Sequence, residues 1–223
     1  MSALVRYQLE LLLRSQRWLP PFLGYLLLLV TGITMGNPLL DSLGFAAAVL
    51  VPVSAWYVRS ALTADPAPAR AVLVAASGPV RVQLASLAAA VIAGLTLAVL
   101  SVAGIWLASG HTTNDPHREV SAAAAAFAGL LGMVACVLTG LAVGVLCNRP
   151  VLLRGGYGIL GTLGLSVLVL VVGGSPANLA IRALVTGSRE VRVELPWLAL
   201  LGALLLAALL AAASAAVARR RTE

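Results

Sequence analysis

The sequence predicts an all-α integral membrane protein with six membrane-spanning helices, preceded by an amphipathic helix that lies on the membrane surface. Of its 223 residues, 61% are hydrophobic and only 10% are charged, whereas charged residues make up about 25% of an ordinary soluble domain. The mean hydropathy is +1.01. The apolar residues fall into long runs, and the arginines gather between those runs. We therefore expect one membrane domain over the whole chain.

Residues 1–17 predict a helix with one apolar face, because leucine and valine recur at helical spacing while charged residues fall between them. The apolar positions are Leu4, Val5, Leu9, Leu12 and Leu13, and the charged positions are Arg6, Glu10, Arg14 and Arg17. Pro20 and Pro21 supply a bend where the chain would turn into the membrane. The segment therefore predicts an interfacial helix, and the alternative is a cytosolic extension of the first span.

Six apolar runs predict the spans. They cover about residues 18–35, 42–58, 82–108, 121–147, 157–172 and 196–217. Most of them come close to the roughly 20 apolar residues that a bilayer core requires, and the longest have room to tilt. Trp18 stands at the start of the first run, where amphipathic aromatic rings prefer the headgroup level.

The segment 59–81 separates the second and third spans and contains a helix-sized run at residues 69–76. Pro66 and Pro68 precede this run, and Gly78 and Pro79 follow it. Proline suits the first turn of a helix, and Gly-Pro ends one, because proline lacks the amide donor and disfavours helix in the residue before it. The loop is therefore predicted to present one short helix outside the membrane.

The arginines predict how the spans are oriented. If the six runs alternate across a membrane, 11 of the 15 arginines fall on one side. These are Arg6, Arg14, Arg17, Arg59, Arg70, Arg81, Arg149, Arg154, Arg219, Arg220 and Arg221, and the other side holds Arg118, Arg182, Arg189 and Arg192. Because basic residues favour the cytosolic side, both termini and the 59–81 loop are predicted to be cytosolic, with the protein in the plasma membrane.

The net charge of +7 is explained by this topology and by contact with anionic lipid headgroups. Nucleic acid is not expected as a partner, because the arginines stand beside apolar runs and form no basic stripe with aromatic residues between them. The bilayer is the expected partner of these charges.

Ionisable residues are missing from the predicted spans, which contain no Asp, Glu, Lys, Arg or His. Ion-coupled transporters usually carry such residues inside the membrane, so proton coupling through buried carboxylates is disfavoured. The chain also lacks a Gly-rich phosphate loop that ends in Gly-Lys-Ser/Thr. We therefore expect no enzyme activity and no cofactor in this chain, and active transport would need a separate polypeptide as its energy source.

One dense polar cluster lies between the third and fourth spans and consists of His111, Asn114, Asp115, His117 and Glu119. Imidazole and carboxylate groups are suitable metal ligands. Their spacing here matches no compact ligand signature, and the Asn-Asp-Pro sequence within the cluster favours a turn. We interpret the cluster as a solvated loop, and no metal site is predicted.

Small and hydroxyl-bearing residues recur in the spans. Gly-x-x-x-Gly occurs at Gly32/Gly36 and at Gly140/Gly144, and such spacing lets helices approach closely, either between subunits or inside one bundle. Most hydroxyl groups in spans are expected to bond to carbonyls of their own helix. A pathway with so few polar groups would suit a lipid-like, peptide or other amphipathic cargo better than an ion.

Two stretches, ARAVLVAASGPVRVQLASLAAA and SPANLAIRAL, together with the six-span layout, resemble the membrane subunit of type-2 ABC transporters. This is a permease family whose members mostly export, and the resemblance covers nearly the whole chain. It implies that residues 68–76 form a coupling helix, which sits in a cleft of a separate ATP-hydrolysing subunit that carries ATP and magnesium. The implied coupling residues are Pro68, Arg70, Leu73 and Val74.

The same resemblance implies roles for other segments. Residues 1–17 correspond to the family's connecting helix, and residues 176–185 to its extracellular re-entrant hairpin. Permeases of this family work in pairs, so a second permease, identical or related, is an expected partner. The implied cargo route between the paired subunits is lined by Ser54, Tyr57, Tyr157, Thr162 and Ser166.

A haem-exporter permease of the same general family is also compatible with the size of the chain, although no residue cluster singles out haem. Two interpretations of other classes stay open as well. The chain could be a non-transporting membrane subunit that scaffolds a complex or confers immunity by sequestering a peptide. It could also be a membrane-embedded enzyme that uses the cluster at His111 and His117.

Overall fold

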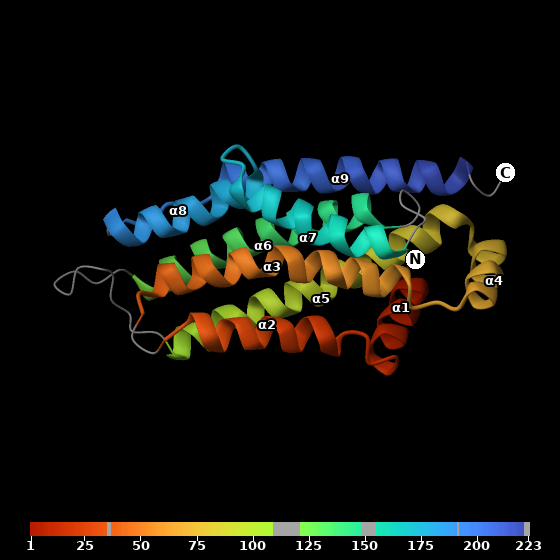
Figure 1. Ribbon diagram of the computed structural model, residues 1–223, viewed down its shortest axis with the longest axis horizontal. Coiled ribbons are helices and arrows are strands. Elements are labelled where there is room, and N and C mark those ends of the chain that lie inside the picture. Colours follow the sequence, from red (N-terminus) through yellow and green to blue (C-terminus); the bar gives the residue numbers. More distant parts are fainter. Residues whose placement is uncertain (35–36, 109–120, 149–154, 191, 221–223) are drawn as a thin grey trace.

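The computed structural model describes residues 1–34, 37–108, 121–148, 155–190 and 192–220, and these residues form nine helices and no strand (Figure 1). The helices are α1 (Ser2–Arg14), α2 (Leu19–Gly32), α3 (Leu39–Leu62), α4 (Ala67–Ser77), α5 (Pro79–Ala108), α6 (Ala122–Cys147), α7 (Gly155–Val171), α8 (Pro176–Glu190) and α9 (Trp197–Arg220). The predicted all-helical class is confirmed for this part of the chain.

The helices α3 and α6 form the centre of the bundle. Most of their side chains are buried, and they pack on each other and on α5 and α8. The helix α9 covers α6, and α2 packs on α3. The core is therefore a set of contacts between long apolar helices, with Leu43, Leu50, Val51 and Met133 among its fully buried side chains.

Four helices are long and apolar enough to cross a membrane, namely α3, α5, α6 and α9. The pair α7 and α8, which meets at a bend of 48°, adds a fifth if the two form one broken span. The structure thus supports a membrane protein with four or five spans. The predicted six spans are not established by it.

The helix α2, which corresponds to the first predicted span, is shorter than the apolar run in the sequence. Prolines occupy the first turn of α2, and the helix ends where Ile33 takes an extended conformation with φ −110° and ψ 115°. Its 14 residues span about 21 Å at 1.5 Å per residue, less than the roughly 30 Å of a bilayer core. The expected boundary at residue 35 lies outside the described residues.

The segment expected to be a re-entrant hairpin, residues 176–185, is the first part of the continuous helix α8. Its buried residues recur at helical spacing and are Ala177, Ala180, Leu184, Gly187 and Ser188. The helix packs on α3, α6 and α9. One apolar face therefore holds α8 against the bundle, and its other face carries the exposed Arg182, Arg189 and Glu190.

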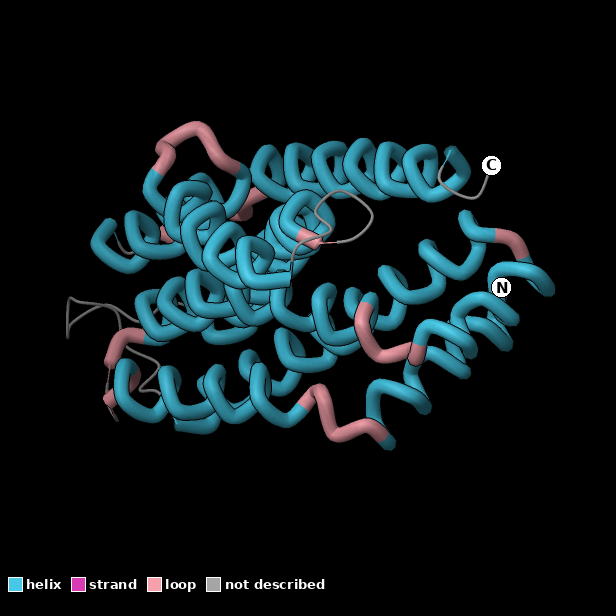
Figure 2. Tube along the Cα trace, turned by 45° about the vertical axis from the view of Figure 1, so that its right-hand side comes forward, coloured by secondary structure: helices cyan, strands magenta, loops and turns pink. Residues whose placement is uncertain are grey.

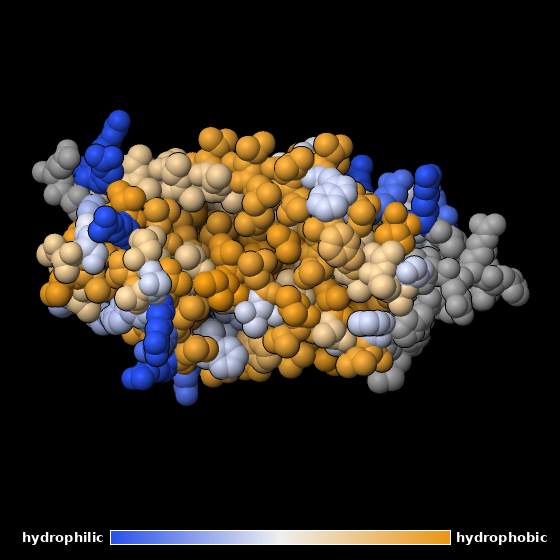
Figure 3. Space-filling model, turned by 180° about the vertical axis from the view of Figure 1, so that it is seen from behind, coloured by the Kyte–Doolittle hydropathy of each residue, from blue (hydrophilic) through white to orange (hydrophobic). Residues whose placement is uncertain are grey.

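The two ends of the bundle differ from its middle in polarity, and the short helices gather at one end. The helices α1 and α4, the N-terminus and the end of α9 lie together at one end, and α4 runs across the bundle axis (Figure 1, Figure 2). One face of the molecule is apolar over its middle, with hydrophilic residues gathered toward both ends (Figure 3). This distribution is the one expected of a bundle that crosses a bilayer.

Candidate functional site

The short helix predicted between the second and third spans is present as α4, and its limits follow from its proline and glycine residues. Pro66 precedes the helix and Pro68 lies in its first turn, where a missing backbone donor costs nothing. Gly78 ends it with φ 84° and ψ 150°, a conformation that is almost confined to glycine. The chain then turns directly into α5, which begins at Pro79.

No residue of α4 is buried, although nearly all of them are apolar. The residues turned to solvent include Pro68, Ala71, Val72 and Ala75, and the Val72 side chain is 69% exposed. Leu73 and Val74 are half-buried, and α5 is the one helix on which α4 packs among the described residues. The end of the bundle therefore presents a small apolar surface formed by Pro68, Ala71, Val72 and Ala75, which we call the α4 outer face.

The four coupling residues predicted from the sequence differ in their exposure on α4. Pro68 lies on the α4 outer face, whereas Arg70, Leu73 and Val74 are only partly exposed on the side toward the bundle. Val72, the most exposed large side chain of the helix, was not among the predicted residues. An alanine-rich helix has no polar face that would have marked the direction of the bundle from sequence alone.

Polar contacts hold the segment before α4 against α1. Gln8 Nε2 donates to Asp65 Oδ2 at 2.8 Å, and both side chains are buried. Arg17 donates to the Thr63 carbonyl oxygen. Burial and the nearby Asp65 carboxylate raise the pKa of the Tyr7 hydroxyl. These contacts attach the start of the α4 loop to the N-terminal helix.

A further contact orients α4 on α5. Arg70 Nη2 donates to Gln83 Oε1 at 3.0 Å, and Gln83 is only 1% exposed. Arg70 is thus directed toward the bundle, away from the α4 outer face. Together with the turn at Gly78, this hydrogen bond fixes α4 to α5.

The predicted cargo-route residues that the structure describes lie on α3 and α7. Ser54 is buried between α3 and α6. A Cβ added at Gly140 of α6 would lie only 2.8 Å from the Ser54 Cβ. Tyr57 borders a cavity next to α1 and α2. Thr162 lies on α7, is buried, and donates to the Gly158 carbonyl oxygen of its own helix. The side chain of Tyr157 lies outside what the structure describes.

The expected self-bonding of hydroxyls is confirmed along the spans. Thr96, Ser101, Thr139, Thr162 and Ser166 each donate to the carbonyl oxygen four residues earlier, over 2.6–2.8 Å. Thr31 does the same at the outer part of α2. Ser54 differs, because its buried hydroxyl has no hydrogen-bond partner among the described residues.

The Gly140/Gly144 pair serves packing inside the bundle. A Cβ added at Gly140 would lie 2.5 Å from the Val51 carbonyl oxygen, and one added at Gly144 would lie 2.6 Å from Val58 Cβ. The backbone of α6 therefore touches α3 at these glycines. Of the two alternatives open for this motif, the structure supports contact between helices of one chain.

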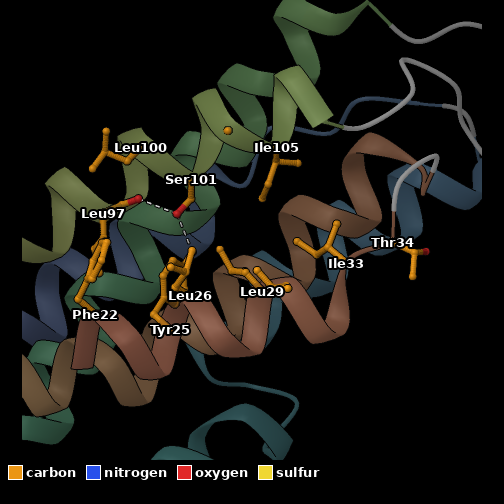
Figure 4. Close-up of a pocket in the computed structure, with 12 residues that line it drawn as sticks. Phe22, Tyr25, Leu26, Leu29, Ile33, Thr34, Leu97, Leu100, Ser101 and Ile105 are labelled. Carbon is orange, nitrogen blue, oxygen red and sulfur yellow. Dashed lines mark hydrogen bonds between the residues drawn. The ribbon is translucent and has the colours of Figure 1, made fainter. Parts of the chain in front are cut away.

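An apolar groove runs between α2 and α5, because the backbone of α2 lies against α3 and α2 meets α5 through side chains such as Tyr25. Its wider part has a volume of about 590 Å³ and is lined from Phe22 to Thr34 on α2 and from Leu97 to Ile105 on α5. Tyr25 and Ser101 meet across it, with 2.8 Å between their oxygens (Figure 4). A second cavity of about 400 Å³ continues toward α1 and shares Phe22, Leu97 and Leu100 with the first.

Metal-ligating residues give no site in the described part of the chain, where no three His, Cys, Asp or Glu side chains are grouped suitably. The cluster of His111, Asn114, Asp115, His117 and Glu119 lies outside the described residues. Comparison with known proteins gives no relative, because no family model, no characterised protein and no solved structure matches this chain.

Proposed function

We propose that this chain is the membrane-spanning permease subunit of an ATP-driven ABC transporter, and that an ATP-hydrolysing partner docks on the α4 outer face. The observation that carries the proposal is α4 itself. An apolar helix without a single buried residue stands across one end of the bundle, where α1, the N-terminus and the end of α9 also lie. Exposed apolar surface beyond a membrane bundle is typical of a site that another protein covers.

The chemistry of the chain makes a separate energy source necessary for active transport. The sequence has no Gly-rich phosphate loop, and charged residues of the long helices stand near their ends, as Asp41 and Arg59 do in α3. Neither ATP hydrolysis nor proton coupling through a buried carboxylate is therefore available to the chain alone. ATP and magnesium would be held by the partner.

The connections of α4 provide a route for mechanical coupling. A force on the α4 outer face acts on α5 through the corner at Gly78 and through the Arg70–Gln83 hydrogen bond. The same force reaches α1 through Asp65 and Gln8. In this proposal, closure of the partner ATPases rocks α3 and α5, and the α4 end of the bundle faces the cytosol. A second permease subunit completes the cargo route.

The proposed cargo is amphipathic, either lipid-like or a peptide, and the proposed direction is export. Support comes from the sparse polar groups in the long helices, most of which bond to their own backbone. A route built from such helices offers few partners to an ion.

The proposal is tested by purifying the full chain together with an ATP-hydrolysing subunit encoded beside it. We expect a complex in detergent, loss of the complex in Val72→Asp, and a weaker effect of Leu73→Asp, because Leu73 is half-buried. Ala3→Asp is the control, since it adds the same charge at an exposed position of α1. A complex that survives Val72→Asp unchanged contradicts docking on α4.

A second candidate function is a non-transporting membrane subunit that scaffolds a complex or sequesters a peptide. It is favoured by the burial of Ser54, Tyr57, Thr162 and Ser166, because side chains buried in the described part of the chain are not exposed to a cargo. This candidate predicts that the biological activity of the complex survives a catalytically inactive ATPase. The transporter proposal predicts that the activity is lost.

A further inference from the structure

The groove between α2 and α5 offers a ligand mostly carbon surface. Ser101 donates to the Leu97 carbonyl oxygen at 2.7 Å, so Tyr25 is the donor toward Ser101. Thr96 donates to the Ile92 carbonyl oxygen at 2.8 Å, and Thr34 donates to Asn37 Oδ1 at 2.7 Å. Each hydroxyl on the groove wall is thus satisfied inside the protein, and the groove calls for an apolar occupant.

The groove is open on the outer side of the bundle, between α2 and α5. Leu100 and Val30, which line it, are 58% and 71% exposed. Protein interiors tolerate few voids larger than a water molecule, and an apolar space of about 590 Å³ holds ordered water poorly. In a bilayer, a molecule from the surrounding membrane must therefore fill the groove.

The dimensions of the groove match one lipid chain. The two neighbouring cavities, which share three lining residues, follow α5 from Ile92 to Ile105, a rise of about 20 Å at 1.5 Å per residue. The hydrocarbon of one leaflet is about 15 Å thick, half of the roughly 30 Å core. One acyl chain of that length therefore covers most of the groove.

Among the described residues, positive charge stands at the α1 end of the groove. The second cavity ends at Leu9, Leu13 and Trp18, and tryptophan prefers the headgroup level of a bilayer. Arg14, next to Leu13, is exposed and has no hydrogen-bond or ion-pair partner among the described residues. The neighbouring Arg17 donates to Thr63 and carries a second positive charge there.

We propose that the groove between α2 and α5 binds one acyl chain of an anionic phospholipid, with the phosphate group beside Arg14 at the α1 end. An apolar tail with one anionic head matches a groove that is apolar throughout and basic at one end. A second copy of the chain fits less well, because two copies in the same orientation would bring their basic α1 ends together. The inference does not depend on an ATPase partner.

The test uses the fluorescence of Trp18 in the full chain, with Trp56, Trp106 and Trp197 replaced by phenylalanine. The protein is placed in phosphatidylcholine vesicles that contain a rising fraction of phosphatidylglycerol brominated in its acyl chains. We expect quenching of Trp18 to saturate at a low fraction of the brominated lipid, as occupancy of one site requires. Quenching that only grows in proportion to the fraction, as contact with bulk lipid would give, overturns the proposal.

Matched variants separate the groove from the rest of the membrane surface. Thr96→Phe adds a ring to the groove wall, and we expect half-saturation to move to a several-fold higher lipid fraction. Thr31→Phe is the control, because Thr31 is also exposed and bonded to its own helix but does not line the groove. If Trp18 is quenched equally in both variants, the groove is not the lipid-binding site.

Two further results decide the nature of the occupant. Arg14→Gln is expected to lower the preference for phosphatidylglycerol over brominated phosphatidylcholine about fivefold, which corresponds to about 1 kcal/mol per arginine near the membrane surface. Arg189→Gln, at the other end of the bundle, should leave the preference unchanged. If Thr96→Phe instead abolishes cross-linking between two copies and leaves quenching unchanged, a second copy fills the groove and the lipid proposal is wrong.

Discussion

Gln8 of α1 donates a hydrogen bond of 2.8 Å to Asp65, a residue 57 positions further along the chain, and both side chains are buried. The contact joins the N-terminal helix to the segment that leads into α4. It also brings a carboxylate into an environment with little solvent, where hydrogen bonds to a charged group are stronger than those between neutral groups. The position of α4 is therefore linked to the position of α1.

Removal of the Gln8 amide should destabilise this junction. Gln8→Ala leaves the Asp65 carboxylate buried without its donor, and we expect a loss of about 1–3 kcal/mol of unfolding free energy. Thermal unfolding in detergent measures the effect. The control is Glu10→Ala, which removes the exposed Arg6–Glu10 ion pair and should cost no more than about 0.5 kcal/mol. Equal shifts for both variants would show that the buried bond is not special.

The close contact of α6 with α3 predicts that a side chain added at Gly140 lowers the stability of the protein. A methyl group there would approach the Val51 carbonyl oxygen to 2.5 Å, and a backbone atom cannot move aside as a flexible side chain can. We expect Gly140→Ala to lower stability by about 1–3 kcal/mol, the usual effect of overpacking. Gly164→Ala, where an added Cβ meets nothing within 4 Å, should be neutral or slightly stabilising. Destabilisation by both substitutions to the same degree would contradict the proposed packing.

The turn at Gly78 predicts an effect that comes from the backbone alone. A Cβ added there meets nothing within 4 Å, but the φ of 84° would cost an alanine about 1–3 kcal/mol of strain. We expect Gly78→Ala to disorder or reorient α4 while the long helices stay folded. Limited proteolysis of the 59–81 segment, compared with thermal unfolding of the bundle, separates these two outcomes. Unchanged protease resistance would show that α4 is held in place without this turn.

Much of the fold could be predicted from the sequence, because long apolar runs in a membrane must satisfy their backbone groups as helices. The helix α4 was also predictable, since Pro66, Pro68 and Gly78 fix where it begins and ends. The lengths of α2 and α8 could not be predicted from the sequence. The extended conformation of Ile33 shortens α2, and tertiary contacts with α3, α6 and α9 stabilise α8 beyond its weakly apolar centre.

The candidate site was less predictable than the fold. Gln8 occupies the apolar face of α1 in the structure, and only its pairing with the distant Asp65 explains the burial of that amide. The groove arises because the backbone of α2 lies against α3, which no periodicity in either helix indicates. The exposure of Val72 could not be predicted, because the direction of α4 depends on the Gly78 turn and on Arg70, which binds Gln83.

The central claim is that the α4 outer face contacts an ATP-hydrolysing partner, and site-specific cross-linking tests it most directly. Cys136 and Cys147 are buried, so a cysteine placed at Val72 is the one readily accessible to a thiol reagent among the described residues. With the partner bound, Val72→Cys should form a cross-link to the ATPase that depends on assembly of the complex, whereas Ala3→Cys should not. A Val72→Cys protein that cross-links no better than Ala3→Cys in an intact complex would contradict the account.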